Sequence, residues 1–451
     1  MRKLLLLLLV ASFPAVASAQ WTFAGNFPDD ESSPHSHGLA VTPDGNVWVQ
    51  SYYPFTGDSV QVAPFPNDPN GCSAATGNCR VTAIHIYSPD GEEVDISPLN
   101  VVTLPGGEQD TLGGEIVYVT PDSTRWSWKE GTGLAVDGDG NVFSSIGKRI
   151  FKFDGETGEV LAVAAPEFLL SGTNSGPGVD ANGNVFVTGT FPGDPLAIFN
   201  SDLDYVENVV DEDVDYNRSV LVLPDGNTVF QLNYTKLAAT VYQRPDEFSP
   251  WDSTGITFQG MAVESAALHP TTGNIWVSAG SPLNPPDAPW QQHTWYEFTV
   301  EDALANAMPT PLDSIQWNNP GDGRPRTIAF SPDGMTAYVG EFSLAAPAVQ
   351  KFVNEGTAVA RGPESSLDLR QNRPNPFSGS TEIAFTLERA ATVSLRVVDT
   401  MGREVATLAD GPLAAGEHRA TFAAGDLAAG VYLYTLNVDG AQTSRRMMVV
   451  R

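Results

Sequence analysis

Six residues occupy the same position in six copies of a short repeated phrase, and their side chains could bind an anion. Each lies five residues before the one that opens a turn of the Pro-Asp-Gly kind. The six are His37, Thr132, Ser175, Arg218, Glu264 and Arg326. A guanidinium group donates paired hydrogen bonds to a carboxylate, and an imidazole can carry a proton near neutral pH. The set therefore predicts a cationic pocket or, as the alternative, an ion-paired plug in which Glu264 neutralises the arginines.

Other kinds of catalytic or metal site find little support in the sequence. It contains no nucleophile elbow, no paired-histidine zinc motif and no phosphate-binding loop. His35 and His37 would share one face of a strand, but we favour a pair without a metal. Asp137, Asp139 and Asn141 resemble half of a calcium loop that lacks its later glutamate ligand. We therefore predict no metal site and no cofactor.

The repeated phrase has the composition of a β-hairpin. Residues 37–49 form a short apolar run, a turn with Pro43, Asp44 and Gly45, and a second apolar run. Proline presets the first angle of a tight turn, aspartate suits the next position, and glycine accepts the left-handed conformation that closes a hairpin. Each copy is therefore expected to supply two buried strands.

The spacing of the copies predicts a β-propeller. The asparagines that follow the turns are separated by 95, 43, 43 and 47 residues, and they are Asn46, Asn141, Asn184, Asn227 and Asn274. A period of roughly 40–45 residues is that of a four-stranded blade. We therefore predict an all-β, six-bladed β-propeller over residues 20–355, with a seventh blade in the long gap as the alternative. The innermost strands would begin at the central channel, so the six aligned residues are expected to ring one of its mouths.

An apolar run at residues 21–25 precedes the first copy. A propeller must close its ring, because open sheet edges invite unwanted pairing. We expect this run to add an outer strand to the last blade.

The pattern Gly-Leu-Ala-Val, three variable residues and Gly-Asn-Val resembles the NHL-type repeat. That repeat is shared by six-bladed propellers similar to streptogramin lyases, gluconolactonases and peptide-amidating lyases. The resemblance covers about residues 21–355 and implies an architecture more than a reaction. We favour a binding or structural module with an unknown small-molecule, glycan or protein ligand; the alternative is a channel-site lyase or lactonase-like hydrolase. A calcium-dependent lactonase is disfavoured, because the aligned position offers only one carboxylate, that of Glu264.

The N-terminal segment predicts export. Residues 1–19 combine two basic residues, an apolar run and a small-residue site that ends at Ala19, which is the pattern of a cleaved signal peptide. No later segment is apolar enough to predict a membrane span. The formal net charge is −30, and the acidic excess lies before residue 365. Such a charge argues against nucleic acid as a partner, and we expect a monomer.

The two cysteines are expected to form a disulfide. Cys72 and Cys79 lie close together in a Gly- and Asn-rich insertion. In an exported chain such a pair most simply pins its own loop. A metal would need further soft ligands nearby, and the sequence supplies none.

Two groups of aromatic residues could contact a ligand. Trp126 and Trp128 would face one way on a predicted hairpin, and the other four would lie in Pro-rich loops between strands; they are Trp251, Trp290, Trp295 and Tyr296. Exposed rings would suit carbohydrate or peptide stacking, whereas packing beneath the loops is the commoner outcome.

A second unit follows a linker at residues 356–366. Residues 367–451 contain short runs in which apolar and polar residues alternate. This pattern predicts a small Ig-like antiparallel β-sandwich.

This tail resembles the type A C-terminal sorting domain of the type IX secretion system. The match is carried by Pro374, Asn375, Pro376, Phe377, Gly402, Gly430, Tyr432, Arg445, Arg446 and Arg451. The resemblance implies that the leader takes the chain to the periplasm and that the outer-membrane translocon then recognises the tail. The secretion machinery is thus the expected partner, and the expected location is secreted or on the outer cell surface. In that family the tail is commonly removed, and the cargo is released or attached to the surface.

Overall fold

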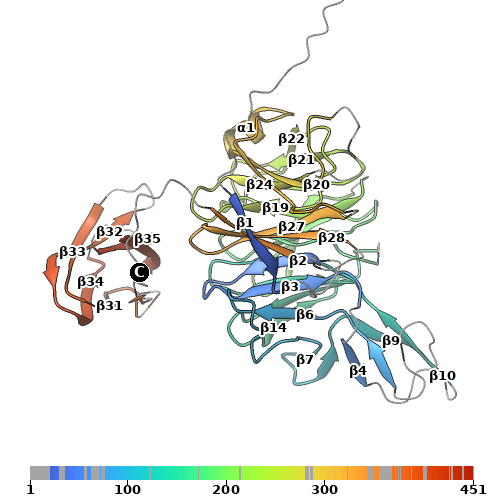
Figure 1. Cartoon of the computed structure of the whole chain (residues 1–451), viewed down its shortest axis with the longest axis horizontal. Coiled ribbons are helices and arrows are strands. Elements are labelled where there is room, and N and C mark those ends of the chain that lie inside the picture. The colour runs from blue at the N-terminus through green and yellow to red at the C-terminus, as the bar shows by residue number, and fades with distance from the viewer. Residues whose placement is uncertain are drawn as a thin grey trace, which may run out of the picture. The chain divides into compact units, whose positions relative to one another are not determined.

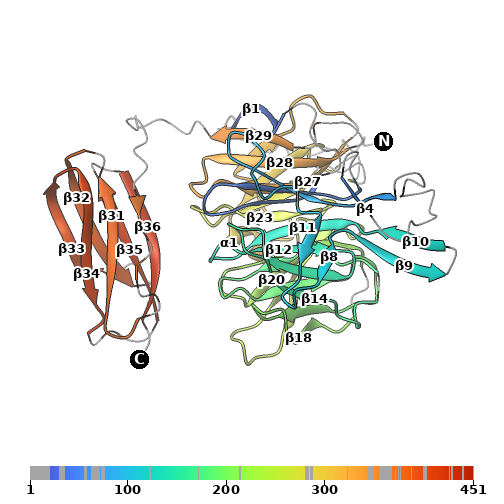
Figure 2. The same ribbon diagram turned by 90° about the horizontal axis from the view of Figure 1, so that it is seen from below.

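The computed structural model divides the chain into two compact units, residues 1–356 and 357–451. It describes residues 21–29, 36–54, 58–61, 72, 77–120, 123–170, 172–212, 215–279, 284, 288–321, 323–343, 347, 349–354, 368–370, 372–373, 375, 377–387, 389–399, 404–425, 427, 430–438 and 441–449. The predicted signal peptide, His35 and the predicted linker lie outside these residues. Figures 1 and 2 show both units, which are described separately below.

Six antiparallel sheets, each built on one copy of the repeated phrase, form the main part of the first unit. The first contains β2 (Ser36–Val41), β3 (Val47–Ser51) and β6 (Ile84–Tyr87). The second contains β11 (Gly131–Val136), β12 (Val142–Ile146), β13 (Arg149–Phe153) and β14 (Val160–Ala164). The third contains β15 (Gly178–Val179), β16 (Val185–Thr188), β17 (Leu196–Phe199) and β18 (Tyr205–Val210).

The other three sheets follow the same plan. The fourth contains β19 (Asn217–Val222), β20 (Thr228–Asn233), β21 (Ala238–Gln243) and β22 (Asp252–Thr257). The fifth contains β23 (Ala266–Leu268), β24 (Ile275–Ala279), β25 (Thr294–Phe298) and β26 (Asp313–Gln316), with the short helix α1 (Val300–Ala305) between its last two strands. The sixth contains β27 (Arg324–Phe330), β28 (Thr336–Phe342) and β29 (Val349–Asn354), completed by β1 (Trp21–Phe27).

The six innermost strands form a closed ring. Each contacts the next in the order β2, β11, β15, β19, β23 and β27, and β27 contacts β2 again. The predicted β-propeller is therefore confirmed, and the described part of the first unit contains six sheets of three or four strands. The sheets pack through apolar clusters that join neighbouring blades, such as that of Trp48, Ile86, Val142 and Phe153.

The long gap between the first two copies contains three small sheets. They pair β4 (Ser59–Gln61) with β5 (Asn78–Arg80), β7 (Val101–Thr103) with β8 (Gln109–Thr111), and β9 (Gly114–Thr120) with β10 (Ser123–Trp128). Both views show β9 and β10 projecting from the first unit (Figures 1 and 2). Cys72 and Cys79 form the predicted disulfide in this region.

Hydrogen bonds explain why the repeat requires aspartate and asparagine at its turns. The Asp137 carboxylate accepts the backbone N–H groups of Asp139 and Asn141, both at 2.9 Å, and the Asn141 side-chain amide at 2.8 Å. Gly140 takes a φ of 90°, which an L side chain rarely adopts. Because this turn joins the end of the innermost strand to the start of the next strand, it lies at the opposite end of the blade from the start of the innermost strand.

The N-terminal strand closes the ring, as predicted. β1 pairs antiparallel with β29, so the sixth sheet combines the two ends of the unit. Trp21 is buried and packs edge-on against Trp276 of the fifth sheet, with ring centroids 5.8 Å apart. Phe27 packs against Tyr338 of the sixth sheet at 4.8 Å.

Replacing Trp21 with alanine is therefore expected to lower the free energy of unfolding of the first unit by about 3 to 5 kcal/mol, because it leaves a large cavity where two sheets meet. Denaturant unfolding followed by tryptophan fluorescence measures the loss. The half-exposed Phe23, on the same strand, provides the control, and its replacement by alanine should cost clearly less. Equal losses at the two positions would contradict the role given to Trp21 in closing the ring.

The second unit is a β-sandwich, as predicted; its immunoglobulin-like topology stays a prediction. One sheet contains β30 (Asp368–Leu369), β31 (Ser380–Leu387) and β34 (Gly416–Ala423). The other contains β33 (Glu404–Leu413), β32 (Ala391–Asp399), β35 (Gly430–Val438) and β36 (Ala441–Val449) in that order. One apolar core joins the two sheets through residues such as Phe385 and Leu395. Among the helices of the described residues, none has the length and apolar character needed to cross a bilayer.

Candidate functional site

Five of the six aligned residues line one cavity at the end of the ring where the innermost strands begin. The cavity measures about 50 Å³, and its lining includes His37, Thr132, Arg218, Glu264 and Arg326. Ser175 is buried in the adjacent strand region, where its hydroxyl accepts the backbone N–H of Thr188 at 3.3 Å. The repeat therefore brings these side chains together from five different blades, and we call this end of the ring the channel mouth.

A shared carboxylate joins the two arginines. Glu264 Oε2 accepts a hydrogen bond from Arg326 Nη1 and lies 3.3 Å from Arg218 Nε. The side chains of Glu264 and Arg326 are 1% and 4% exposed, and that of Arg218 is 18% exposed. Burial, together with the neighbouring charge of Arg218, lowers the pKa of Arg326 well below its usual range. Two cations and one anion meet at the cavity, so it carries a net positive charge.

The ion pairs leave several polar atoms around the cavity without a hydrogen bond. Within the described part of the chain, no hydrogen-bond partner reaches Glu264 Oε1 or Arg326 Nε, and the 3.3 Å contact of Arg218 Nε with Glu264 Oε2 is an ion pair without hydrogen-bond geometry. The hydroxyls of Ser219 and Ser265, which also line the cavity, lack one too. Buried polar groups in folded proteins nearly always have a partner. This cluster of five atoms therefore indicates a site that takes up water or a polar ligand.

Apolar side chains close the cavity beneath the charged residues. Leu39, Leu134, Val220 and Ile328 line it, and each lies two residues after one of the aligned positions. The register with the second strand shifts at each of these four aligned positions, so the polar residue lies at an irregularity of the ladder and the apolar residue lies in the regular part of the strand that follows. A ligand would meet charge first and hydrocarbon second.

Aromatic rings hold both arginines in place. The guanidinium of Arg326 lies 5.1 Å from the ring centre of Phe342, and that of Arg218 lies 4.5 Å from that of Tyr234. Such contacts stabilise a cation over the face of a ring. Tyr52 packs against His37 with ring centroids 4.7 Å apart. His37 Nδ1 lies 3.4 Å from the backbone carbonyl of Thr132, which fixes the imidazole between two blades.

The sequence did not single out these aromatic residues. Tyr52 and Tyr234 follow the second strands of the first and fourth copies, and Phe342 ends that of the sixth. Aligning the copies at the end of the second strand would have found them. The aromatic residues that the sequence offered for stacking do not line the cavity. Trp126, Trp290, Trp295 and Tyr296 are buried, and all of these except Trp290 lie on strands. Packing, the outcome that we expected to be commoner than stacking, is therefore the outcome for these four residues.

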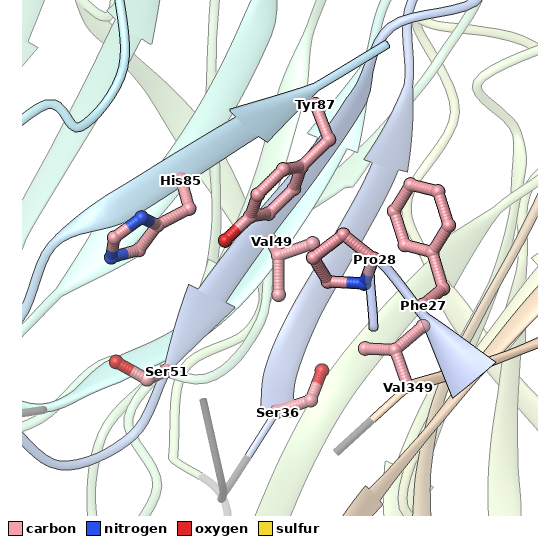
Figure 3. A pocket seen from close by; sticks show the side chains of 8 residues that line it. All are labelled: Phe27, Pro28, Ser36, Val49, Ser51, His85, Tyr87 and Val349. Atoms are coloured by element: carbon pink, nitrogen blue, oxygen red, sulfur yellow. The ribbon is translucent and has the colours of Figure 1, made fainter. Parts of the chain in front are cut away.

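A second, smaller cavity lies at the junction of the first and sixth sheets. Figure 3 shows its lining, which includes His85 and Tyr87 on β6 and Val349 on β29. Its volume of about 10 Å³ is close to the minimum for one water molecule. His85 lies between two carboxylates, with Nε2 3.1 Å from Asp58 and Nδ1 3.0 Å from Glu93. This cluster is suited to holding the insertion after β3 against the first sheet.

The charge on His85 makes this contact pH-dependent. Burial lowers the pKa of His85, but the hydrogen bonds and charges of Asp58 and Glu93 outweigh it, so the net shift is upward. For Glu93, burial raises the pKa, and the bonds from Ser97 and His85 outweigh it, so the net shift is downward. The histidine contribution is present below its unfolded pKa of about 6.5 and is lost as the pH rises through the folded value. The glutamate contribution is present above about 4.3 and is lost as the pH falls through its folded value.

The loss of stability caused by His85→Gln should therefore be greatest between about pH 4.5 and 6.5 and should shrink as the medium becomes alkaline. Denaturant unfolding of both proteins over this pH series measures the difference. The same substitution at the partly exposed His418 of the second unit provides the control. A loss that is independent of pH would show that His85 contributes packing alone.

The predicted sorting residues all belong to the second unit, and the propeller forms the first. Phe377 and Tyr432 are buried in the core of the sandwich, and Arg445 Nε donates to the Leu369 carbonyl at 2.6 Å. Gly430 opens β35, Arg446 lies on β36, and Asn375 is exposed. The remaining predicted sorting residues lie outside the described part of the chain; they are Pro374, Pro376, Gly402 and Arg451.

The protein thus combines a β-propeller with a C-terminal β-sandwich. Residues 373–450 match the secretion system C-terminal sorting domain, which confirms the predicted type IX sorting tail. The chain is therefore exported by the type IX secretion system, to be secreted or to reach the cell surface.

Solved structures share this architecture only distantly. PorZ, described as an essential bacterial surface component of the type IX secretion system of Porphyromonas gingivalis, is 14% identical, with a TM-score of 0.40 over 95% of this chain and 60% of its own. The chain thus spans about 60% of the length of PorZ. The WD40 repeats of RRP9 are 11% identical, with a TM-score of 0.44 over 74% of this chain and 99% of theirs. A functionally unknown protein from Desulfotomaculum acetoxidans is 15% identical, with a TM-score of 0.39 over 74% and 96%. No curated protein matches the sequence.

Proposed function

We propose that the protein is an exported binding module whose propeller takes up a carboxylate-bearing ligand at the channel mouth. The observation that carries the proposal is the set of five buried polar atoms around the cavity without a hydrogen-bond partner among the described residues. Four of them are donors, namely Nε of Arg218, Nε of Arg326 and the hydroxyls of Ser219 and Ser265. A carboxylate is an acceptor-only group when ionised, and it suits a site rich in donors.

The charge of the site favours one negative charge in the ligand. Arg218 and Arg326 contribute two positive charges, and Glu264 contributes one negative charge. A buried net charge is costly, so neutralising it is favourable. Glu264 neutralises one of the two arginine charges, and one bound monoanion would neutralise the other.

The wider charge distribution supports the same direction of approach. Exposed carboxylates lie on the repeat turns at the opposite end of the ring from the channel mouth, and they include Asp44, Asp139, Asp225 and Asp333. An acidic far end and a cationic mouth would steer an anion toward the mouth, although the effect weakens with salt.

The alternative, a channel-site lyase or lactonase, has less support. Glu264 is the one carboxylate in the lining of the cavity, and both arginines already engage it in ion pairs. No group of three or more histidine, cysteine or acidic side chains fit to hold a metal occurs within the described ranges. The ion-paired plug, by contrast, remains the direct competitor, and the following experiment separates it from a ligand site.

Arg218→Gln is the most informative variant. It removes the net positive charge, yet keeps the buried ion pair between Arg326 and Glu264, so the ring should stay folded. Acetate should raise the Tm of the unchanged protein more than acetamide does, because a ligand that binds the folded state stabilises it. In the variant the two additives should act alike.

Arg244→Gln is the matched control, because Arg244 follows β21 at the end of the ring opposite the channel mouth. It should retain the preference for acetate. Equal effects of acetate and acetamide on the unchanged protein would refute the ligand site and favour the plug.

A further inference from the structure

Aromatic side chains flank the channel mouth on one side. Tyr53 follows β3, is 38% exposed, and contacts Trp128 with ring centroids 5.3 Å apart. It also contacts Phe342, the ring that lies against Arg326, at 6.0 Å. These residues come from the first and sixth sheets and from the strand that leads into the second. One side of the mouth therefore carries an accessible ring that is connected by packing to the arginine site.

A second pair of rings lies across the mouth. Phe191, in the loop after β16, and Tyr216, just before β19, are 46% and 40% exposed and pack edge to face at 5.6 Å. Both segments lie at the end of the ring where the innermost strands begin. In a closed ring of six sheets, the third and fourth lie opposite the sixth and first. The two aromatic groups therefore lie on blades at opposite sides of the channel mouth.

The size of the cavity limits what can enter it. A volume of about 50 Å³ has room for roughly three to five water-sized atoms. A carboxylate group fits that space, whereas a whole sugar ring or a large side chain does not. The rest of any carboxylate ligand must lie above the cavity, at the level of the exposed rings.

We infer that the ligand is an acidic polysaccharide that crosses the channel mouth, with one uronate carboxylate in the cavity and adjacent sugar rings against Tyr53 on one side and Tyr216 with Phe191 on the other. This inference rests on the proposed function and adds the class of ligand. Aromatic rings offer flat apolar faces to the C–H faces of sugars. The unpaired hydroxyls of Ser219 and Ser265 line the cavity, where they can donate to the uronate carboxylate.

An acidic peptide is a different class of ligand and fits the site less well. It would bring one carboxylate to the arginines, but its flexible side chains would not present flat faces to two separate aromatic groups. A chain of uronate rings is stiff and repeats both features, the carboxylate and the ring, at every unit. The peptide is therefore kept as an outcome of the test.

The test compares binding of galacturonate with that of its hexamer to the full exported chain by calorimetry at about 0.15 M ionic strength, because at low salt the acidic chain would repel a polyanion as it would repel nucleic acid. The hexamer should bind at least about tenfold more tightly, since it reaches the cavity and both aromatic groups together. The methyl-esterified hexamer, which has the same length but no free carboxylate, should bind far more weakly. Replacing Tyr216 with alanine should weaken hexamer binding by about three- to tenfold and leave acetate binding unchanged.

Phe248→Ala is the matched control, because Phe248 is 89% exposed but lies between β21 and β22 at the opposite end of the ring. This variant should bind the hexamer as the unchanged protein does. Equal affinity for monomer and hexamer, or equal effects of the Tyr216 and Phe248 changes, would overturn the polysaccharide assignment. Tighter binding of a hexaglutamate peptide would overturn it in favour of a protein ligand. In each of these cases, acetate binding that depends on Arg218 would leave the proposed function standing. If the unchanged protein did not bind acetate, both the proposed function and the polysaccharide assignment would fall.

Discussion

Replacing Glu264 with glutamine is expected to lower the free energy of unfolding of the propeller by about 3 to 5 kcal/mol. The carboxylate is 1% exposed and lies against Arg326 and Arg218, so its loss leaves two buried cations beside each other. Removing one partner of a buried ion pair is far more costly than replacing both partners with apolar residues of similar volume. Glutamine keeps the shape of the side chain, so the loss reports charge rather than packing.

Urea unfolding at neutral pH measures this change. Glu156→Gln, on an exposed turn of the second sheet, is the control and should change stability by no more than about 0.5 kcal/mol. The account makes a second, more specific demand on the Glu264 variant. A small anion should restore part of the lost stability, because it can take the place of the missing carboxylate, and acetate should do so better than acetamide. A variant as stable as the parent would show that the buried pair is not what organises the channel mouth.

Deleting residues 365–451 should abolish delivery of the propeller to the outside of the cell. The sorting domain spans residues 373–450 and is a compact unit with its own core, centred on residues such as Phe377 and Tyr434. Its removal should leave the propeller folded, because the ring closes through β1 and β29 without the tail. In a host with a working type IX system, fractionation and immunoblotting should find the truncated protein in the periplasm and not in the medium or at the cell surface.

A milder variant provides the comparison. Phe377→Ala opens a cavity in the sandwich and should reduce export in proportion to the loss of folded sorting domain, whereas Arg244→Gln in the propeller should leave export unchanged. Normal export of the truncated chain would contradict the role of the tail. A propeller that is degraded rather than retained would instead contradict the independence of the two units.

The ring could be predicted because its repeat carries local structural information. A turn such as that of Asp137 is specified by a carboxylate that accepts two backbone N–H groups within four residues, and this constraint is visible in the sequence. The similar spacing of these turns from the second copy to the fifth, 43 to 47 residues, then implies blades of similar size. The pairing of β1 with β29 followed from topology rather than from residue type, since a ring must join its ends.

The channel mouth was predictable only in part. Each innermost strand begins at the channel, so the aligned residues were expected to meet there, and five of the six line the cavity. The register of the first two strands shifts at His37, so regular strand alternation does not by itself explain this result. The sharing of Glu264 between two arginines depends on side-chain conformations from three blades, which the sequence left open between a pocket and a plug. The rings of Tyr53, Phe191 and Tyr216 lie in segments outside the repeated phrase, where length and conformation vary from blade to blade. Their convergence follows from the closed ring and not from any local pattern.

The most direct test of a carboxylate site at the channel mouth is fluorine NMR of fluoroacetate in the presence of the full exported chain. The account predicts a broadened and shifted resonance that acetate reverses by competition and acetamide does not. The effect should persist in Arg244→Gln and vanish in Arg218→Gln while that variant remains folded by circular dichroism. A resonance that the protein leaves unchanged, or one that is broadened equally in the Arg218 variant, would contradict the site.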